Sequence, residues 1–211
     1  MDYHFINRTN LVFEPTNPNG SVVLVFHGGF GTPGFIQNTT KLETVFTDSY
    51  VVYPSSDTSK LWKSGNQAID VAYIHSLLYQ LASDYPDIDL TQVHLIGHSN
   101  GGMMCYKLAG YLSKFPFASI NTLSACYTAD DVFEYTGPVY HYHTVNDVIV
   151  PIEGGQVYPS LVWTMDAVKS ANCFFDIRSF NSMTDDDAHK LNKILENYPS
   201  LFTEMKTRLG I

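Results

Sequence analysis

Short and nearly continuous apolar runs recur along the chain, separated by longer segments in which apolar residues have helical spacing. The runs are rich in β-branched and aromatic residues, which is typical of strands covered on both faces. They are SVVLVF (21–26), YVVYP (50–54), VHLIG (93–97), SINTLSA (119–125), PVYHYH (138–143) and CFFDIRSF (173–180). The helical spacing predicts helices at about 66–84, 100–113, 156–171 and 187–208.

The alternation of strands and helices predicts an α/β protein with a mostly parallel, twisted sheet flanked by helices. The opening stretches FIN (5–7) and LVF (11–13) are interpreted as an antiparallel edge hairpin. No repeat, low-complexity tract or long linker divides the sequence, so residues 1–211 are predicted to form a single domain. Ligands of such sheets bind beyond the carboxyl ends of the strands, which makes the residues directly after each strand the candidates for chemistry.

Composition and charge narrow the class of protein. Hydrophobic residues make up 45% of the 211 residues, enough for a sizeable core, and the formal net charge is −9. That charge repels phosphate backbones and anionic membranes, so neither nucleic acid nor a membrane is an expected partner. With no secretory-signal pattern and no apolar run long enough to span a bilayer, we predict a cytoplasmic protein, and leave open whether it forms a homodimer.

The segment Gly97-His98-Ser99-Asn100-Gly101 follows an apolar run and precedes an amphipathic one. It has the G-x-S-x-G spacing of a nucleophile elbow in a strand–turn–helix context. Glycines are needed there because a Cβ would collide with the reversing backbone. Ser99 is therefore the candidate nucleophile, against the alternative of an ordinary glycine-rich loop. The N–H of Asn100, at the start of a helix, is a candidate oxyanion donor, and His98 is a candidate substrate contact.

A second glycine-rich turn, HGGFGTPG (27–34), follows the first long strand. It matches neither the dinucleotide pattern nor the P-loop. The pattern favours an oxyanion loop in which Gly29 or Phe30 supplies the second backbone N–H, and the alternative is a plain flexible loop. His27, at its start, is a candidate substrate contact.

In proteins that carry a nucleophilic serine on such an elbow, the acid and then the base of the triad follow the serine along the chain. Asp147 lies just beyond the strand PVYHYH, and is favoured over Asp130 and Asp131, which follow the previous strand. His189 is the only histidine after Asp147, so it is the candidate base, against the alternative of a surface histidine. The carboxylate would orient the imidazole, which would take the serine proton.

Metal or disulfide chemistry is not expected. His141 and His143 share one face of a strand and could in principle ligate a metal, but the sequence offers no third ligand. Cys105, Cys126 and Cys173 are too widely spaced for a disulfide framework or a zinc site, which favours buried small side chains. No cofactor is required by the predicted chemistry.

Residues 21–172 resemble the polyhydroxybutyrate depolymerase and feruloyl esterase group of α/β-hydrolases, most specifically in GHSNGGMM and in D-x-x-V-P-x-x-G-G. The resemblance implies an α/β-hydrolase fold, Ser99 as nucleophile, Asp147 as acid and an aromatic, Trp62, near the substrate entrance. Two departures stand out. KSGN replaces the cysteines that many secreted members carry after the tryptophan, and the motif G-G-H-x-W-P is missing, so His189 is assigned by order and position. Its context, DAHKLNKIL, is more similar to small carboxylesterases and lysophospholipase-like thioesterases.

These features predict a serine carboxylic ester hydrolase acting through an acyl-enzyme on short-chain, phenolic (feruloyl-like) or hydroxyalkanoate-type esters. The segment TADDVFEYTG (128–137) is too short for a sizeable cap, so the site is expected to be open to small or oligomeric ester substrates. The alternatives are a thioesterase or lysophospholipase-like hydrolase, and a catalytically silent binding protein that keeps the fold.

Overall fold

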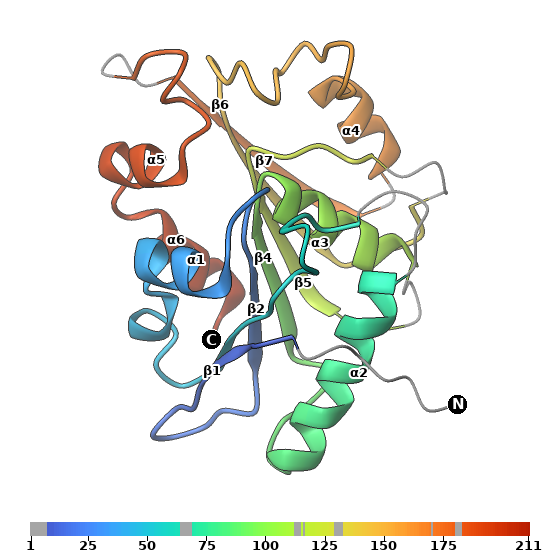
Figure 1. The fold of residues 1–211 in the computed structure, drawn as a ribbon, viewed down its shortest axis with the longest axis vertical. Coiled ribbons are helices and arrows are strands. Elements are labelled where there is room, and N and C mark those ends of the chain that lie inside the picture. The colour runs from blue at the N-terminus through green and yellow to red at the C-terminus, as the bar shows by residue number, and fades with distance from the viewer. Residues whose placement is uncertain are drawn as a thin grey trace.

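The computed structural model describes residues 8–63, 69–111, 115, 117–128, 133–169, 171–179 and 183–211. In this part of the chain, seven strands form one sheet in the order β1-β3-β2-β4-β5-β6-β7 (Figure 1). Every neighbouring pair is parallel except β1 and β3, which are antiparallel. The strands are β1 (Leu11–Phe13), β2 (Val22–Phe26), β3 (Tyr50–Tyr53), β4 (Val93–His98), β5 (Phe117–Leu123), β6 (Pro138–Thr144) and β7 (Asn172–Arg178).

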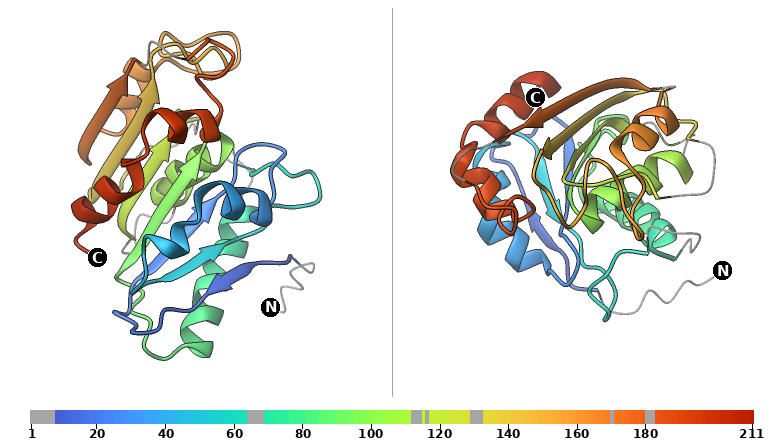
Figure 2. Two further views of the ribbon diagram at one scale, coloured as in Figure 1. Left: turned by 90° about the vertical axis from the view of Figure 1, so that its left-hand side faces the viewer. Right: turned by 90° about the horizontal axis from the view of Figure 1, so that it is seen from above.

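Six α-helices and one short 3-10 helix accompany the described strands, and none of the helices is long and apolar enough to cross a membrane. They are α1 (Pro33–Thr40), η1 (Leu42–Thr44), α2 (Ile69–Asp84), α3 (Asn100–Tyr111), α4 (Leu161–Ala167), α5 (Leu191–Asn197) and α6 (Leu201–Leu209). Seen from above, α1, α5 and α6 lie on one side of the sheet and α2, α3 and α4 on the other (Figure 2).

The predicted mostly parallel sheet with helices on both sides is confirmed. LVF forms the edge strand β1, but its partner is β3, and residues 5–7 lie outside the described part of the chain. The prediction of one helix over 187–208 is wrong, because α5 ends at Asn197 and α6 begins at Leu201. Pro199 explains the break, since proline lacks a backbone N–H and disfavours helical geometry in the residue before it.

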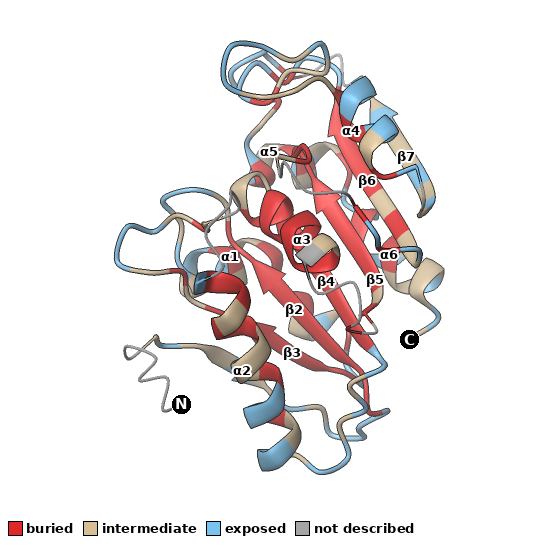
Figure 3. Ribbon diagram, turned by 90° about the vertical axis from the view of Figure 1, so that its right-hand side faces the viewer, coloured by how far each residue is buried: buried red, intermediate tan, exposed pale blue. Residues whose placement is uncertain are grey.

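The two larger hydrophobic cores lie on the two faces of the sheet. Val22, Leu24 and Phe26 of β2 contribute to the core beneath α2 and α3, whereas Val23 and Val25 contribute to the core beneath α1, α5 and α6. All five residues are fully buried, which explains why this strand is apolar at every position rather than at alternate ones. Burial decreases toward the edge, and β7 exposes several of its side chains (Figure 3).

The carboxyl ends of the parallel strands meet at one edge of the sheet, where the functional loops are expected. The segments after β2, β4, β6 and β7 carry the glycine-rich turn, Ser99, Asp147 and His189, respectively. Only residues 124–137 separate β5 from β6, and the described part of this segment forms no helix or strand that could serve as a cap.

Candidate active site

Ser99 occupies a strained turn between β4 and α3. Its φ of 53° lies in the left-handed region, which is unfavourable for a residue with a side chain. The turn is held from both sides, because the N–H of Ser99 donates to the carbonyl of Leu123 at 2.8 Å and its carbonyl accepts from the N–H of Met103 at 3.0 Å. Neighbouring elements therefore enforce the conformation that raises the Ser99 side chain above the sheet edge.

Two glycines allow this turn to pack. A Cβ on Gly97 would lie 2.4 Å from the carbonyl oxygen of Gly101, and a Cβ on Gly101 would lie 2.3 Å from the carbonyl oxygen of Phe26. Both obstacles are backbone atoms, which cannot swing aside as a flexible side chain can. The G-x-S-x-G spacing thus reflects the close approach of α3 to the end of β2.

His189 connects Ser99 to Asp147. Its Nε2 lies 2.8 Å from Oγ of Ser99, and its Nδ1 lies 2.7 Å from Oδ2 of Asp147. An ionised carboxylate only accepts hydrogen bonds, so Nδ1 carries the proton and Nε2 is free to accept the proton of the serine hydroxyl. The structure brings together the three residues proposed from the sequence as nucleophile, base and acid, in the orientation of a Ser–His–Asp triad.

Asp147 is buried, with 2% of its surface exposed, yet its polar atoms are well satisfied. Oδ1 accepts from the N–H groups of Ile149 and Val150 at 2.9 and 2.8 Å, while Oδ2 faces His189. Burial raises the pKa of this carboxyl, but the hydrogen bonds from His189 and Val150 outweigh it, and the pKa lies below its usual value. Asp130 and Asp131, the alternative acids, lie outside the described residues.

His98 fastens the nucleophile turn to the loop that carries the base. Its Nε2 donates to the carbonyl oxygen of His189 at 2.8 Å. Burial, followed by the proximity of His189, lowers the pKa of His98 to about 3, so the ring is neutral. The sequence suggested a substrate contact. The structure places the ring on the cavity wall with its N–H group already committed to the protein.

The two oxyanion candidates in the glycine-rich turn differ in geometry. The N–H of Phe30 donates to the carbonyl of Lys60 at 2.8 Å, so this donor is occupied and the structure corrects the Phe30 candidate. Gly29 adjoins the elbow, because its Cβ position lies 3.8 Å from Cβ of Asn100. The N–H of Asn100 belongs to the first turn of α3, where backbone donors have no acceptor within the helix.

Trp62 and His27 are supports beneath the turn, which corrects their prediction as substrate contacts. They are 2% and 1% exposed, respectively. The indole N–H of Trp62 donates to the carbonyl of His27 at 2.9 Å, and its ring packs edge-on against Phe26. Nδ1 of His27 donates to the carbonyl of Gly28 at 2.7 Å, and Nε2 lies 3.4 Å from the N–H of Ser56. Neither side chain has a polar atom left for a ligand.

The Asn100 side chain has a role that sequence reasoning missed. Its Oδ1 accepts from the backbone N–H of Trp62 at 2.6 Å, and its Nδ2 donates to the carbonyl of the same residue at 3.1 Å. A primary amide carries both a donor and an acceptor, so it can pair with both polar groups of one backbone residue. The residue after Ser99 therefore locks the loop that in turn holds Phe30.

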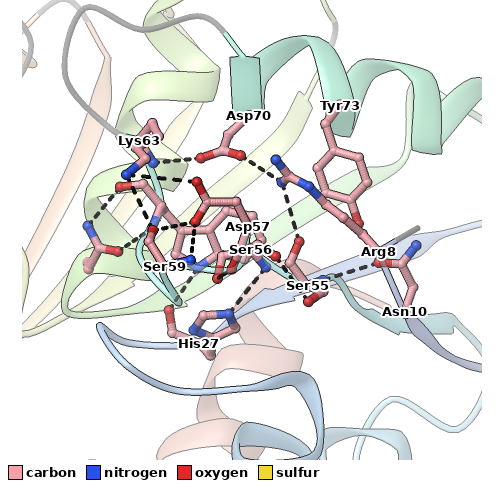
Figure 4. Close-up of polar contacts among 12 residues, drawn as sticks. Arg8, Asn10, His27, Ser55, Ser56, Asp57, Ser59, Lys63, Asp70 and Tyr73 are labelled. Atoms are coloured by element: carbon pink, nitrogen blue, oxygen red, sulfur yellow. Dashed lines mark hydrogen bonds and ion pairs between the residues drawn. The ribbon is translucent and has the colours of Figure 1, made fainter. Parts of the chain in front are cut away.

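A polar cluster anchors this loop from behind (Figure 4). Oδ2 of Asp70 accepts from the backbone N–H of Lys63 at 2.6 Å, and Oδ1 pairs with the Arg8 guanidinium at 2.6 Å. The guanidinium also lies 4.2 Å from the ring centroid of Tyr73. The loop after β3 is thus tied to both α2 and the N-terminal segment.

An open cavity of about 330 Å³ lies above the triad. The wall combines glycine backbone with the exposed ring of Phe35, and is lined by Gly28, Gly29, Gly31, Phe35, His98, Ser99, His189, Lys190, Leu191 and Asn192. This volume suits a small acyl or aromatic group. The described residues contain no group of three or more histidine, cysteine or acidic side chains that could hold a metal ion.

Comparison with known proteins assigns the fold. No family model and no curated protein matches the sequence. A solved thermostable esterase is similar over 95% of this chain and 58% of its own, with 16% identity and a TM-score of 0.71. A phospholipase/carboxylesterase from Dyadobacter fermentans is similar over 90% and 95% of the two chains, with 13% identity and a TM-score of 0.63. The acylaminoacyl peptidase of Pyrococcus horikoshii is similar over 95% of this chain and 39% of its own, with 16% identity and a TM-score of 0.63.

The chain therefore has the α/β-hydrolase fold, as predicted. It spans less than two thirds of the thermostable esterase and nearly the whole of the Dyadobacter protein.

Proposed function

We propose that this protein is a serine hydrolase that cleaves carboxylic esters through an acyl-enzyme intermediate. The observation that carries the proposal is the continuous hydrogen-bonded path from Ser99 through His189 to Asp147, which ends at a strained serine beneath an open cavity. Backbone strain at a side chain with a base in contact is typical of an activated nucleophile.

In the first half of the reaction, Oγ of Ser99 attacks the ester carbonyl carbon while Nε2 of His189 takes the hydroxyl proton. The carbonyl oxygen becomes an oxyanion, which on this proposal accepts hydrogen bonds from the N–H groups of Gly29 and Asn100. The imidazolium then gives its proton to the leaving alcohol as the C–O bond breaks, which leaves an acyl-serine. Asp147 stabilises the transient positive charge on the ring.

In the second half, a water molecule attacks the acyl carbon, and Nε2 of His189 takes one of its protons. The tetrahedral species collapses, the proton returns to Oγ of Ser99, and the carboxylic acid leaves. Both halves use the same side chains and backbone N–H groups together with water, so the proposed reaction requires no cofactor.

The preferred substrates on this proposal are short-chain or phenolic (feruloyl-like) esters, including hydroxyalkanoate-type esters. The support is the modest size of the cavity, its opening to solvent and the ring of Phe35 at its wall, 65% exposed. A thioester would use the same triad with a thiol as leaving group. The ratio of rates on matched oxygen esters and thioesters therefore ranks the two activities.

The experiment combines a fluorophosphonate probe with p-nitrophenyl acetate, butyrate, octanoate and ferulate. We expect the probe to label Ser99, located by mass spectrometry, and the acetate or ferulate to be hydrolysed fastest. Ser99→Ala and His189→Ala should each lower turnover by at least about 10⁴-fold while the protein stays folded.

Ser124→Ala is the matched control. Ser124 is also a serine with positive φ at the end of a neighbouring strand, but it does not line the cavity above the triad. This variant should keep its labelling and its turnover. A folded protein that leaves Ser99 unlabelled and all four esters intact would contradict the proposal.

A further inference from the structure

A line of buried polar groups continues behind Asp147, on the side away from Ser99. On β6, Nε2 of His141 lies 3.0 Å from Nδ1 of His143, and the two rings are stacked. Nδ1 of His141 lies 2.8 Å from both the Tyr106 hydroxyl and the Thr122 hydroxyl. We call Tyr106, Thr122, His141 and His143 the buried histidine chain. All four residues are at most 5% exposed.

The far end of the buried histidine chain reaches the acid of the triad. Nε2 of His143 lies 2.8 Å from the carbonyl oxygen of Val150 and 3.6 Å from Oδ2 of Asp147. Val150 also donates its N–H to Oδ1 of Asp147. His143 therefore contacts both the carboxylate and the turn that shapes it.

The partners determine where the protons lie. Nε2 of His143 faces only acceptors, the Val150 carbonyl and the Asp147 carboxylate, so it carries the hydrogen. Its Nδ1 must then accept, which requires His141 to carry its hydrogen on Nε2. Nδ1 of His141 in turn accepts from a hydroxyl of Tyr106 or Thr122. Burial lowers the pKa of both histidines, consistent with neutral rings.

All the donors in the buried histidine chain consequently point toward Asp147. The other titratable groups around Asp147 are His189, His98 and the Cys126 thiol. Burial lowers the pKa of His98 to about 3, and burial and, to a lesser extent, Asp147 raise the pKa of Cys126 to about 12. On β7, Asp176 and Arg178 pair with each other at 2.9 Å on the opposite face of the sheet from the His143 side chain, because they are in register with Tyr142 and Thr144. The N–H of His143 is thus the polar group of β6 that faces Asp147.

We infer that His143, oriented by His141, is a positioning residue for the triad acid: it fixes the Asp147–Val150 turn and moderates the negative charge that His189 experiences. On this inference, His141 and His143 position the carboxylate of Asp147 and do not bind a metal. This inference rests on the proposed hydrolase function.

Removing the His143 donor should change the pH profile in a defined direction. Without it, the charge of Asp147 is less compensated, so Asp147 and its imidazole partner both hold protons more tightly. A base that is already protonated cannot accept the proton of Ser99. The acidic limb of kcat/KM should therefore move to higher pH, which a loss of packing alone would not produce.

The experiment compares His143→Phe with His143→Gln in the full chain, with p-nitrophenyl acetate as substrate. We expect His143→Phe to lower kcat about tenfold. Its acidic limb should move up by roughly half a pH unit to one unit. His143→Gln restores an N–H donor and should recover most of both effects. An active His143→Phe variant with an unmoved acidic limb would overturn the inference.

A measurement on the unmodified protein keeps the inference testable if the variants do not fold. Ring-nitrogen chemical shifts of labelled histidines, followed by NMR across neutral pH, should show His143 neutral with its hydrogen on Nε2. A protonated ring, or a hydrogen on Nδ1, would overturn the assignment. Absence of esterase activity and probe labelling in the unmodified protein would instead count against the proposed function.

Discussion

Two buried carboxylates, Asp70 and Asp147, solve the same physical problem with different partners. They are 0% and 2% exposed. Asp70 accepts from one backbone N–H and Asp147 from two, and each carboxylate also has a close charged or chargeable side-chain partner. Asp70 pairs with the guanidinium of Arg8 at 2.6 Å, whereas Asp147 pairs with the imidazole of His189 at 2.7 Å. The degree of burial is similar, so the difference lies in the partner.

The partner decides what each carboxylate can do. A guanidinium keeps its proton at every pH that a protein experiences, so Asp70 and Arg8 form a fixed link that anchors the loop after β3. An imidazole can accept and release a proton, so the pair of Asp147 and His189 can change its charge during a reaction. The first carboxylate is suited to holding structure and the second to moving a proton.

The largest expected effect comes from Asp147→Asn. An amide can offer its NH₂ group to the imidazole and select the tautomer with Nε2 protonated, which cannot accept the serine proton. Turnover of p-nitrophenyl acetate should fall about 10⁴-fold while the thermal midpoint changes little. A folded variant that keeps more than about a tenth of the turnover would contradict this role.

Asp70→Asn should have the opposite effect: it should lower the stability of the protein and leave its turnover nearly unchanged. It leaves the Arg8 charge without its counter-ion, and we expect the free energy of unfolding in urea to fall by about 3 kcal/mol. This is the lower end for a broken buried pair, because the Arg8 side chain is 10% exposed and can reach water. Turnover per folded molecule should stay close to that of the original protein.

The double variant Arg8→Met/Asp70→Asn is the control for that experiment. With both charges removed, no buried charge is left unpaired, so the double variant should be more stable than Asp70→Asn alone. Equal stability of the two variants would show that Arg8 is not held by Asp70.

A smaller effect is expected at His98, which joins the nucleophile turn to the base. His98→Phe keeps a ring but removes the donor to the His189 carbonyl. The base is then less well aligned, and kcat should fall about 10- to 100-fold with KM nearly unchanged. His98→Gln keeps an N–H donor, so its kcat should fall less. Equal losses of kcat in both variants would show that the hydrogen bond is not the cause.

The remaining prediction concerns the pH dependence of stability. Burial lowers the pKa of His94 to about 4 and that of His98 to about 3, and the pKa of Asp147 is also lowered. Groups of this kind contribute stability that is present above their unfolded pKa and is lost as the pH falls. The free energy of unfolding should therefore decline below about pH 6.5, where unfolded histidines take up protons.

Urea unfolding at neutral and mildly acidic pH measures this decline. His94→Gln removes one buried titrating ring and should make the decline shallower. A stability that does not change with pH across this interval would contradict the expectation.

Much of the fold and the order of the triad could be predicted because the underlying physics is local. A serine between glycines after a buried strand is forced into a tight turn, and the only histidine downstream of Asp147 leaves one candidate base. Continuous apolar runs also identify central strands, since both faces of those strands are covered.

The supporting contacts could not be predicted because they join residues far apart in sequence. The hydrogen bond from His98 to the His189 carbonyl spans 91 positions, and the pair between Asn100 and Trp62 spans 38. The resemblance implied that Trp62 lies near the substrate entrance, yet Asn100 holds its loop against the end of β2. His141 and His143 were correctly placed on one face, but what they face depends on the turn at Asp147.

The position of His189 along the chain links the completion of the site to the docking of α5 and α6. His189 precedes α5 and α6, which pack with α1 on one face of the sheet, while Ser99 lies on the turn directly after the central strand β4. If the central sheet has formed but α5 and α6 have not docked, Ser99 lies on its strained turn without His189 beside it. On the proposed function, recovery of esterase activity after dilution from urea should then follow the docking of α5 and α6.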